Sequence, residues 1–169
     1  MTGTIGFRNF RETSLATLCF SMAIWGLFAF FLIQCEVAAA DSDPWNSAQT
    51  VKPADLVREL ANNKQTPLTV LYVGFRTLYN GGHIPGSSFH GTPSTEKGLA
   101  ELKSWADSLP RSTNLVLYCG CCPLERCPNI RPAFTTLQQM GFANLRVLIL
   151  PTSFAADWAE KGFPVEKAH

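Results

Sequence analysis

The sequence predicts an α/β domain in which helices are layered on a parallel β-sheet. Short apolar runs of β-forming residues alternate with segments whose apolar residues recur at helical spacing. Such alternation implies parallel strands joined by right-handed helical crossovers. The 169 residues suffice for one such domain with a single core, and a composition of 46% apolar and 16% charged residues excludes a disordered or collagen-like chain.

The N-terminus is predicted to be an export signal that is separate from the domain. Arg8 and Arg11 precede an uncharged, apolar stretch over residues 13–35, and the Ala-Ala-Ala triplet at 38–40 is typical of a signal-peptidase site. A signal peptide over residues 1–40 makes the protein exported, either periplasmic or in the cell envelope. The apolar stretch is also just long enough to remain as an uncleaved membrane anchor, and only then is a membrane expected as a partner.

A polar linker over residues 41–50 is expected to lead into a domain over residues 51–167. The first helix is predicted to begin at Pro53, because proline suits a first helical turn and the apolar residues that follow share one face. A run of β-formers over residues 68–73 lies between a proline and a glycine, which predicts a buried strand. Glycine and proline residues over 81–86 predict a loop.

The second half of the domain continues the alternation. Apolar residues at helical spacing predict an amphipathic helix over about 95–108, which the following proline stops. Residues 115–118 form the next predicted strand. A helix that ends at Gly141, a strand over 145–150 and a helix over 154–160 follow, and a glycine caps the last of these.

A cysteine-rich loop follows the 115–118 strand directly. Its four thiols are Cys119, Cys121, Cys122 and Cys127. Cys119 lies where the carboxyl end of a parallel strand meets the next helix, so free amides and the helix dipole are expected to lower its pKa and make it a nucleophile. Arg126 and Arg131 are candidate binding residues for an anionic substrate, and Asn129 is a candidate N-cap of the helix.

The other three thiols leave several alternatives open. Cys121 or Cys122 could act as a second thiol or as the nucleophile itself. A disulfide between Cys122 and Cys127 is a candidate, because close cysteines pair in an oxidising compartment. The four thiols could instead hold Zn²⁺ or Cu(I), but a crowded CxCC pattern is a poor tetrahedral template, so no metal is expected.

Several motifs in this order are shared with a known family. They are Gly82-His-Ile-Pro-Gly86, a strand that ends in Tyr118-Cys119, Gly141-Phe142, and the tail Trp158-x3-Gly162-Phe-Pro-Val165. Over about residues 50–167 the chain resembles a single-domain rhodanese, a sulfurtransferase, and its Cys-Gly-Cys-Cys-Pro loop is most similar to exported bacterial members. Where the family usually carries an acidic residue and an arginine, this chain has Tyr72 and Gly74.

The resemblance implies a three-layer α/β/α domain with a central parallel sheet, in which Cys119 accepts sulfur and loop amides surround its persulfide. The expected function is an exported sulfurtransferase that passes sulfane sulfur from a small donor to a thiol acceptor or an exported protein thiol, without a cofactor. Nucleic acid is not an expected partner, because the net charge is +1 and the basic residues are scattered. The alternatives are a thiol–disulfide redox protein and a non-catalytic module that binds a metal or a partner.

Overall fold

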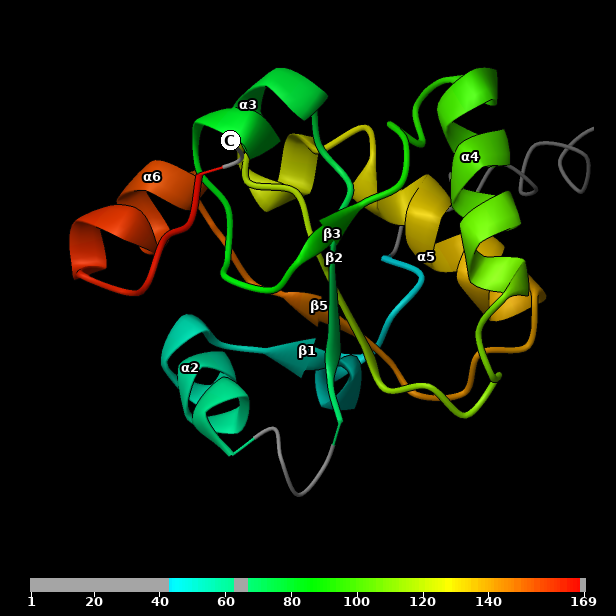
Figure 1. Cartoon of the computed structure of the whole chain (residues 1–169), viewed down its shortest axis with the longest axis horizontal. Helices are drawn as coiled ribbons and strands as arrows, with labels where there is room; N and C mark the ends of the chain where they lie inside the picture. Colours follow the sequence, from blue (N-terminus) through cyan, green and yellow to red (C-terminus); the bar gives the residue numbers. More distant parts are fainter. Residues whose placement is uncertain (1–42, 63–66, 168–169) are drawn as a thin grey trace, which may run out of the picture. The chain divides into compact units, whose positions relative to one another are not determined.

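The computed structural model describes residues 43–62 and 67–167, which form a five-stranded parallel sheet with helices on both faces. The strands are β1 (Thr50–Val51), β2 (Thr69–Tyr72), β3 (Ser88–Phe89), β4 (Leu115–Tyr118) and β5 (Leu145–Leu148). Their order in the sheet is β1-β5-β4-β2-β3, and every neighbouring pair is parallel (Figure 1). β4 is the central strand, and all four of its residues are buried.

Within the described residues, five α-helices and three short 3₁₀ turns accompany the strands. They are η1 (Ser47–Gln49), α2 (Pro53–Ala61), α3 (Arg76–Gly81), α4 (Glu96–Asp107), η2 (Leu124–Arg126), α5 (Ile130–Gln139), α6 (Phe154–Asp157) and η3 (Ala159–Lys161). Helices α4 and α5 cover one face of the sheet, and α2 and α6 cover the other (Figure 1). The predicted three-layer α/β/α architecture is therefore confirmed.

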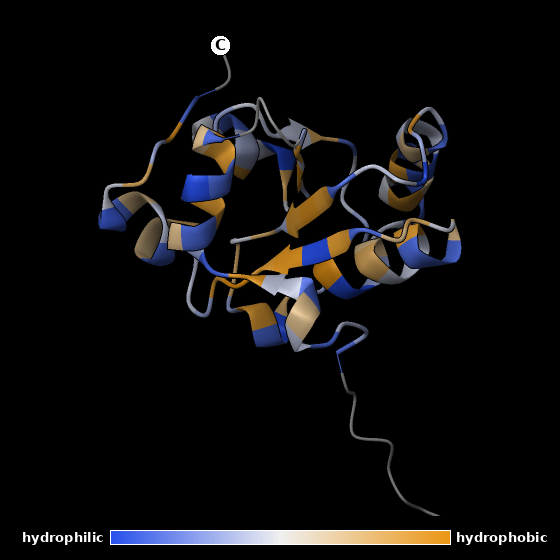
Figure 2. Ribbon diagram, turned by 90° about the horizontal axis from the view of Figure 1, so that it is seen from below, coloured by the Kyte–Doolittle hydropathy of each residue, from blue (hydrophilic) through white to orange (hydrophobic). Residues whose placement is uncertain are grey.

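Each face of the sheet has its own apolar core. Leu71 and Leu117 face Leu102 of α4 and Phe134 of α5, whereas the neighbouring strand residues point the other way, toward α2 and the buried Trp158. This alternation follows from the two-residue period of a strand. Because both faces are covered, the strands are mostly apolar, which Figure 2 shows as largely hydrophobic arrows between the helices, with Arg146 of β5 as a charged exception.

The elements that the sequence did not predict include one helix and one strand, α3 and β3. Helix α3 has six residues and strand β3 has two, and neither shows a repeated apolar pattern. Both lie around the predicted 81–86 loop, where His83 pairs with Glu166 in an isolated antiparallel bridge. That bridge holds the C-terminal tail against the loop.

The predicted linker needs correction over its described part, residues 43–50. Trp45 is buried against Phe134, with ring centroids 5.5 Å apart in an edge-to-face arrangement. Thr50 starts β1, which pairs with β5. The domain therefore extends to at least Asp43, because Trp45 supplies apolar area that the α5 face buries.

The predicted signal peptide over 1–40 lies outside the described residues. Within the part of the chain that the structure describes, no helix is both long and apolar enough to cross a bilayer.

Candidate functional site

The cysteine loop begins where β4 ends, at the carboxyl edge of the sheet. Gly120 turns the chain there with φ +73°, a left-handed conformation that favours glycine. Its carbonyl accepts a hydrogen bond of 2.9 Å from the Phe154 amide at the start of α6. A Cβ added to Gly120 would lie 2.5 Å from the Cβ of Phe154, so the loop and α6 are in close contact.

Three sulfur atoms meet in this loop. The Sγ atoms of Cys119, Cys121 and Cys127 all lie within 4.8 Å of one another, and we call these residues the thiol cluster. Cys119 and Cys127 are buried, whereas Cys121 is half-buried. The Sγ–Sγ distance is 3.0 Å from Cys119 to Cys121 and 3.4 Å from Cys121 to the half-buried Cys122.

The candidate disulfide between Cys122 and Cys127 is not present in this structure, in which all four loop cysteines are free thiols. The sequence places Cys122 and Cys127 five residues apart, but η2 lies between them and returns the chain so that Cys127 faces Cys119 and Cys121 instead.

The thiol cluster favours one thiolate, and it lies on Cys127. Hydrogen bonds from Cys119 and then Cys121 lower the pKa of Cys127 to about 3, and the backbone amides of Asn129 and Ile130 at the start of α5 add to them against the effect of burial. A hydrogen bond with Cys121 lowers the pKa of Cys119, but donation to Cys127, burial and the charge on Cys127 outweigh it and raise that pKa to about 12.

The expectation that Cys119 has the lowered pKa is therefore wrong. The amides at the start of α5 reach Cys127, because the long loop places that residue rather than Cys119 beneath the helix. Cys119 instead carries a proton that it donates to Cys127. The three sulfurs titrate as one unit, and the proton can move between them.

This arrangement predicts a thiolate that persists in acid. Because the folded pKa of Cys127 lies below the free value of about 8.5, its stabilising contribution is fully present above that value and is lost as the pH falls through about 3. Ultraviolet titration should find about one thiolate per chain at neutral pH. Cys127→Ser should abolish that absorbance, and the matched Cys122→Ser should keep it. A wild-type chain without thiolate absorbance at neutral pH would contradict the assignment.

Asn129 supports the cluster in a way that the sequence did not predict. It stands at the N-cap position of α5, but its side chain makes no capping hydrogen bond. Its Oδ1 accepts from the Ser94 amide at 3.1 Å, and its Nδ2 donates to the Sγ of Cys119 at 3.8 Å. The buried amide therefore links the cysteine loop to the segment before α4.

The two arginines predicted to bind substrate lie elsewhere. The guanidinium of Arg131 donates to Asp43 at 2.6 Å and to the carbonyl of Leu124 at 3.3 Å, and it lies over the Trp45 ring. Arg126 is exposed on η2. Neither of them lines the pocket beside the thiol cluster, so neither is placed to hold a donor there.

That pocket has a volume of about 440 Å³, and we call it the apolar pocket. It is formed by α3, α6, the C-terminal tail and the start of the cysteine loop. Its lining residues are Tyr72, Thr77, Leu78, Gly81, Gly82, Gly120, Cys121, Ser153, Phe154, Ala155, Ala159 and Val165. The sequence did not predict this pocket, because one wall is the unpredicted helix α3.

Tyr72 occupies the space that a side chain at position 74 would need. A Cβ added to Gly74 would lie 2.2 Å from the Tyr72 hydroxyl oxygen. Tyr72 is 2% exposed, and its ring packs edge-on against Tyr118, with centroids 5.1 Å apart. Burial, followed by the nearby sulfurs of Cys119 and Cys121, raises the Tyr72 pKa, so the hydroxyl stays neutral.

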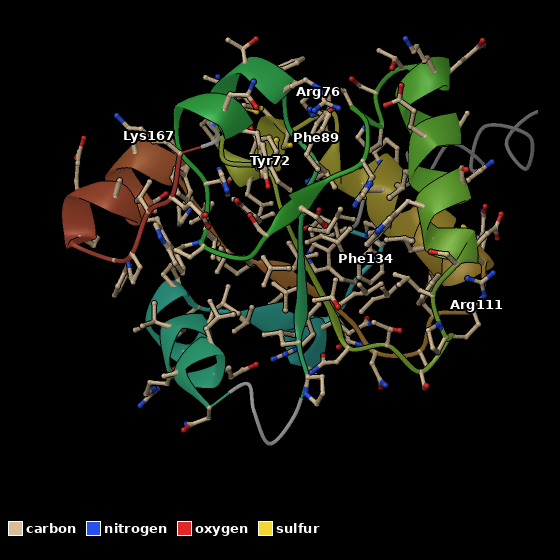
Figure 3. All side chains as sticks on the ribbon, viewed as in Figure 1. Tyr72, Arg76, Phe89, Arg111, Phe134 and Lys167 are labelled. Atoms are coloured by element: carbon tan, nitrogen blue, oxygen red, sulfur yellow. The ribbon has the colours of Figure 1, made fainter. Side chains whose placement is uncertain are left out.

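Arg76, the cation nearest to Tyr72 in the sequence, packs on an aromatic ring. The guanidinium of Arg76 lies over the Phe89 ring, 4.4 Å from its centroid, and Figure 3 shows these two residues beside Tyr72. Phe89 in turn lies 6.1 Å from the Tyr72 ring. Arg76 is therefore held on β3 and does not line the apolar pocket.

The thiol cluster has the ligand chemistry of a soft-metal site. Sulfur ligands select Zn²⁺ and Cu(I), and a tetrahedral zinc with bonds of about 2.3 Å separates its sulfurs by about 3.8 Å. Separations within 4.8 Å are compatible with that geometry after small side-chain rotations. Cys122, beside Cys121, could supply a fourth sulfur.

Comparison with solved structures identifies the fold. The rhodanese-like domain of an Anabaena protein, solved in solution, is 23% identical with a TM-score of 0.53, and the match covers 71% of this chain and 80% of that one. A crystal structure of the same Anabaena protein gives 24% identity, a TM-score of 0.53, and coverage of 70% and 82%. A Bacillus halodurans protein is 16% identical with a TM-score of 0.56, and the match covers 87% and 86%.

No protein-family model and no curated protein matches the chain. The structural matches show that the domain has the rhodanese-like fold, as the sequence predicted from its motifs.

Proposed function

We propose that this rhodanese-like domain is a sulfurtransferase that carries sulfane sulfur as a persulfide on Cys119. The observation that carries the proposal is the thiol cluster at the carboxyl end of the central strand β4, where ligands of parallel α/β folds bind. Cys119 is the first residue after that strand; it is 3% exposed, and its sulfur lies within 4.8 Å of two other sulfurs.

The cluster supports a double displacement, because its three sulfurs titrate as one unit and share a single negative charge. When the proton lies on Cys127, the Cys119 thiolate attacks the outer sulfur of a donor R–S–SH. The S–S bond of the donor breaks, R–S⁻ leaves and takes up a proton, and Cys119–S–SH remains. An acceptor thiolate then attacks the outer sulfur and releases the Cys119 thiolate.

Binding of a soft metal ion is a second candidate function, and the three sulfurs within 4.8 Å favour it. The two functions exclude each other at any moment, because a metal-bound Cys119 cannot attack a donor. Metal content therefore has to be measured together with sulfur transfer.

Mass spectrometry tests the first function. After treatment with thiosulfate or inorganic polysulfide, peptide mapping should find a gain of about 32 Da, one sulfur atom, on Cys119. Stoichiometric zinc or copper by elemental analysis, with no sulfur uptake by the metal-free protein, would favour the second function. A disulfide in place of a persulfide, with sulfide released, would instead favour a redox protein.

We also propose that the domain works outside the cytoplasm, on the basis of the charge-free apolar stretch and the alanine triplet within residues 1–40. N-terminal sequencing of protein from the cell envelope should begin near Asp41. An intact Met1 in the cytosolic fraction would contradict export, and an intact chain in the membrane fraction would indicate an anchor.

A further inference from the structure

We propose that the apolar pocket binds the uncharged organic group of the sulfur donor, so that the preferred donor is an apolar organic hydropersulfide rather than thiosulfate. This inference rests on the proposed function, because it names the substrate class of the same site. It adds a binding site that is formed largely by α3, α6 and the C-terminal tail.

The composition of the pocket disfavours a strongly charged ligand. None of the described residues that line it carries a charge, and its polar side chains are hydroxyls and a thiol. An anion such as thiosulfate would lose hydration on entering, with no cation to compensate. A volume of about 440 Å³ suits a small organic group.

The exposed apolar residues of the domain gather around this pocket. The large hydrophobic residues that are exposed in the described chain are Phe75 at 48%, Leu78 at 49% and Val165 at 42%. Leu78 and Val165 line the pocket, and Phe75 immediately precedes α3. Exposed apolar side chains that cluster beside a reactive group are typical of a ligand-binding site.

The carboxylate next to the rim has other partners. Glu166 follows Val165, but its carboxylate accepts from the Gly86 amide at 3.3 Å and lies 4.0 Å from the Nε2 of His83. Paired backbone hydrogen bonds between His83 and Glu166, of 2.8 and 2.9 Å, hold this tail in place. These contacts hold Val165 at the pocket, while the carboxylate of Glu166 is directed to the 83–86 loop.

Tyr72 and Gly74 give this side of the pocket an uncharged aromatic wall. A longer side chain at position 74 would collide with the Tyr72 hydroxyl, and the raised pKa of that hydroxyl keeps it neutral. Position 74 therefore cannot carry a longer, charged side chain while Tyr72 stays in place. We attribute the apolar character of the pocket to the Tyr72 wall together with α3.

The pocket also directs a donor toward the reactive sulfurs. It ends at Gly120 and Cys121, and the Sγ of Cys121 is 3.0 Å from the Sγ of Cys119. A donor whose organic group sits between Leu78 and Phe154 presents its S–S bond to the thiol cluster. Sulfur transfer to Cys119 then releases the organic thiol, as in the displacement above.

Two donors that differ only in charge test this inference on the full-length protein. The probes are benzyl hydropersulfide and para-carboxybenzyl hydropersulfide, and the readout is the rate at which Cys119 gains one sulfur. We expect the benzyl donor to be faster by roughly tenfold or more, since a carboxylate would enter the pocket unpaired. Leu78→Lys should narrow or reverse this ratio, and the matched Ala100→Lys, an exposed position on α4, should leave it unchanged.

The outcomes separate this inference from the proposed function. Equal rates for the two donors, faster transfer from thiosulfate, or a ratio insensitive to Leu78→Lys would overturn the apolar pocket while leaving sulfur transfer intact. Absence of sulfur uptake from every donor would overturn the proposed function. Binding of benzyl mercaptan would then still test the pocket: NMR shifts confined to Leu78, Phe154 and Val165 would support it, and their absence would contradict it.

Discussion

Replacing Cys119 by serine is expected to abolish sulfur transfer and leave the fold intact. A serine hydroxyl is not ionised near neutral pH, and the Cys127 thiolate is too weak a base to generate an alkoxide from it. The loss should be at least about 10³-fold, because no covalent intermediate forms. Steady-state transfer to a thiol acceptor, with persulfide mapping of each cysteine, measures it.

The size of the two side chains supports an intact fold. Cys119 is buried, but its neighbours are sulfurs and the Asn129 amide, which a hydroxyl can also contact. The unfolding temperature should therefore stay close to that of the wild type. Cys122→Ser is the matched control, because Cys122 is half-buried beside the cluster, and it should keep persulfide formation. If Cys119→Ser still turns over, with sulfur on Cys121, the nucleophile has been assigned to the wrong residue.

The architecture could be predicted because its signals are local. Each central strand is a short run of β-formers between turn residues, and each long helix has an apolar face, so the order of elements follows from the sequence. The strand-end position of Cys119 follows from the same alternation. The six residues of α3 and the two of β3 show no repeated apolar pattern, which is why these two elements were not predicted.

The electrostatics of the loop could not be predicted, because they depend on which sulfur the α5 amides reach. The sequence places Cys119 next to the strand and leaves the path of the following residues open. In the structure η2 turns the chain so that Cys127 receives the amides and Cys119 becomes a hydrogen-bond donor. Likewise, the sequence shows Tyr72 and Gly74 as two unrelated departures from the family pattern. In the structure the two are linked, because the tyrosine side chain fills the volume beside the glycine.

Gly120→Ala is expected to destabilise the domain and to slow sulfur transfer. The alanine must keep φ near +73°, which costs about 1–2 kcal/mol, and its Cβ would meet Phe154 at 2.5 Å, which adds about 1–3 kcal/mol. The free energy of unfolding should therefore fall by about 2–5 kcal/mol. Any relief of the clash moves the loop or α6, and a displacement of about 1 Å at the cluster can slow transfer about 100-fold.

Gly86→Ala is the control for the cost of the left-handed backbone conformation alone. Gly86 has the same φ of +73°, and its added Cβ would meet nothing within 4 Å. That variant should lose only about 1–2 kcal/mol and keep its transfer rate. Denaturant unfolding and persulfide transfer at a temperature where both variants are folded measure the two effects. If both variants lost the same unfolding free energy and kept the same transfer rate, α6 would be able to move away from the loop at no cost. The close approach of Gly120 to Phe154 would then have no part in holding the thiol cluster beside the apolar pocket.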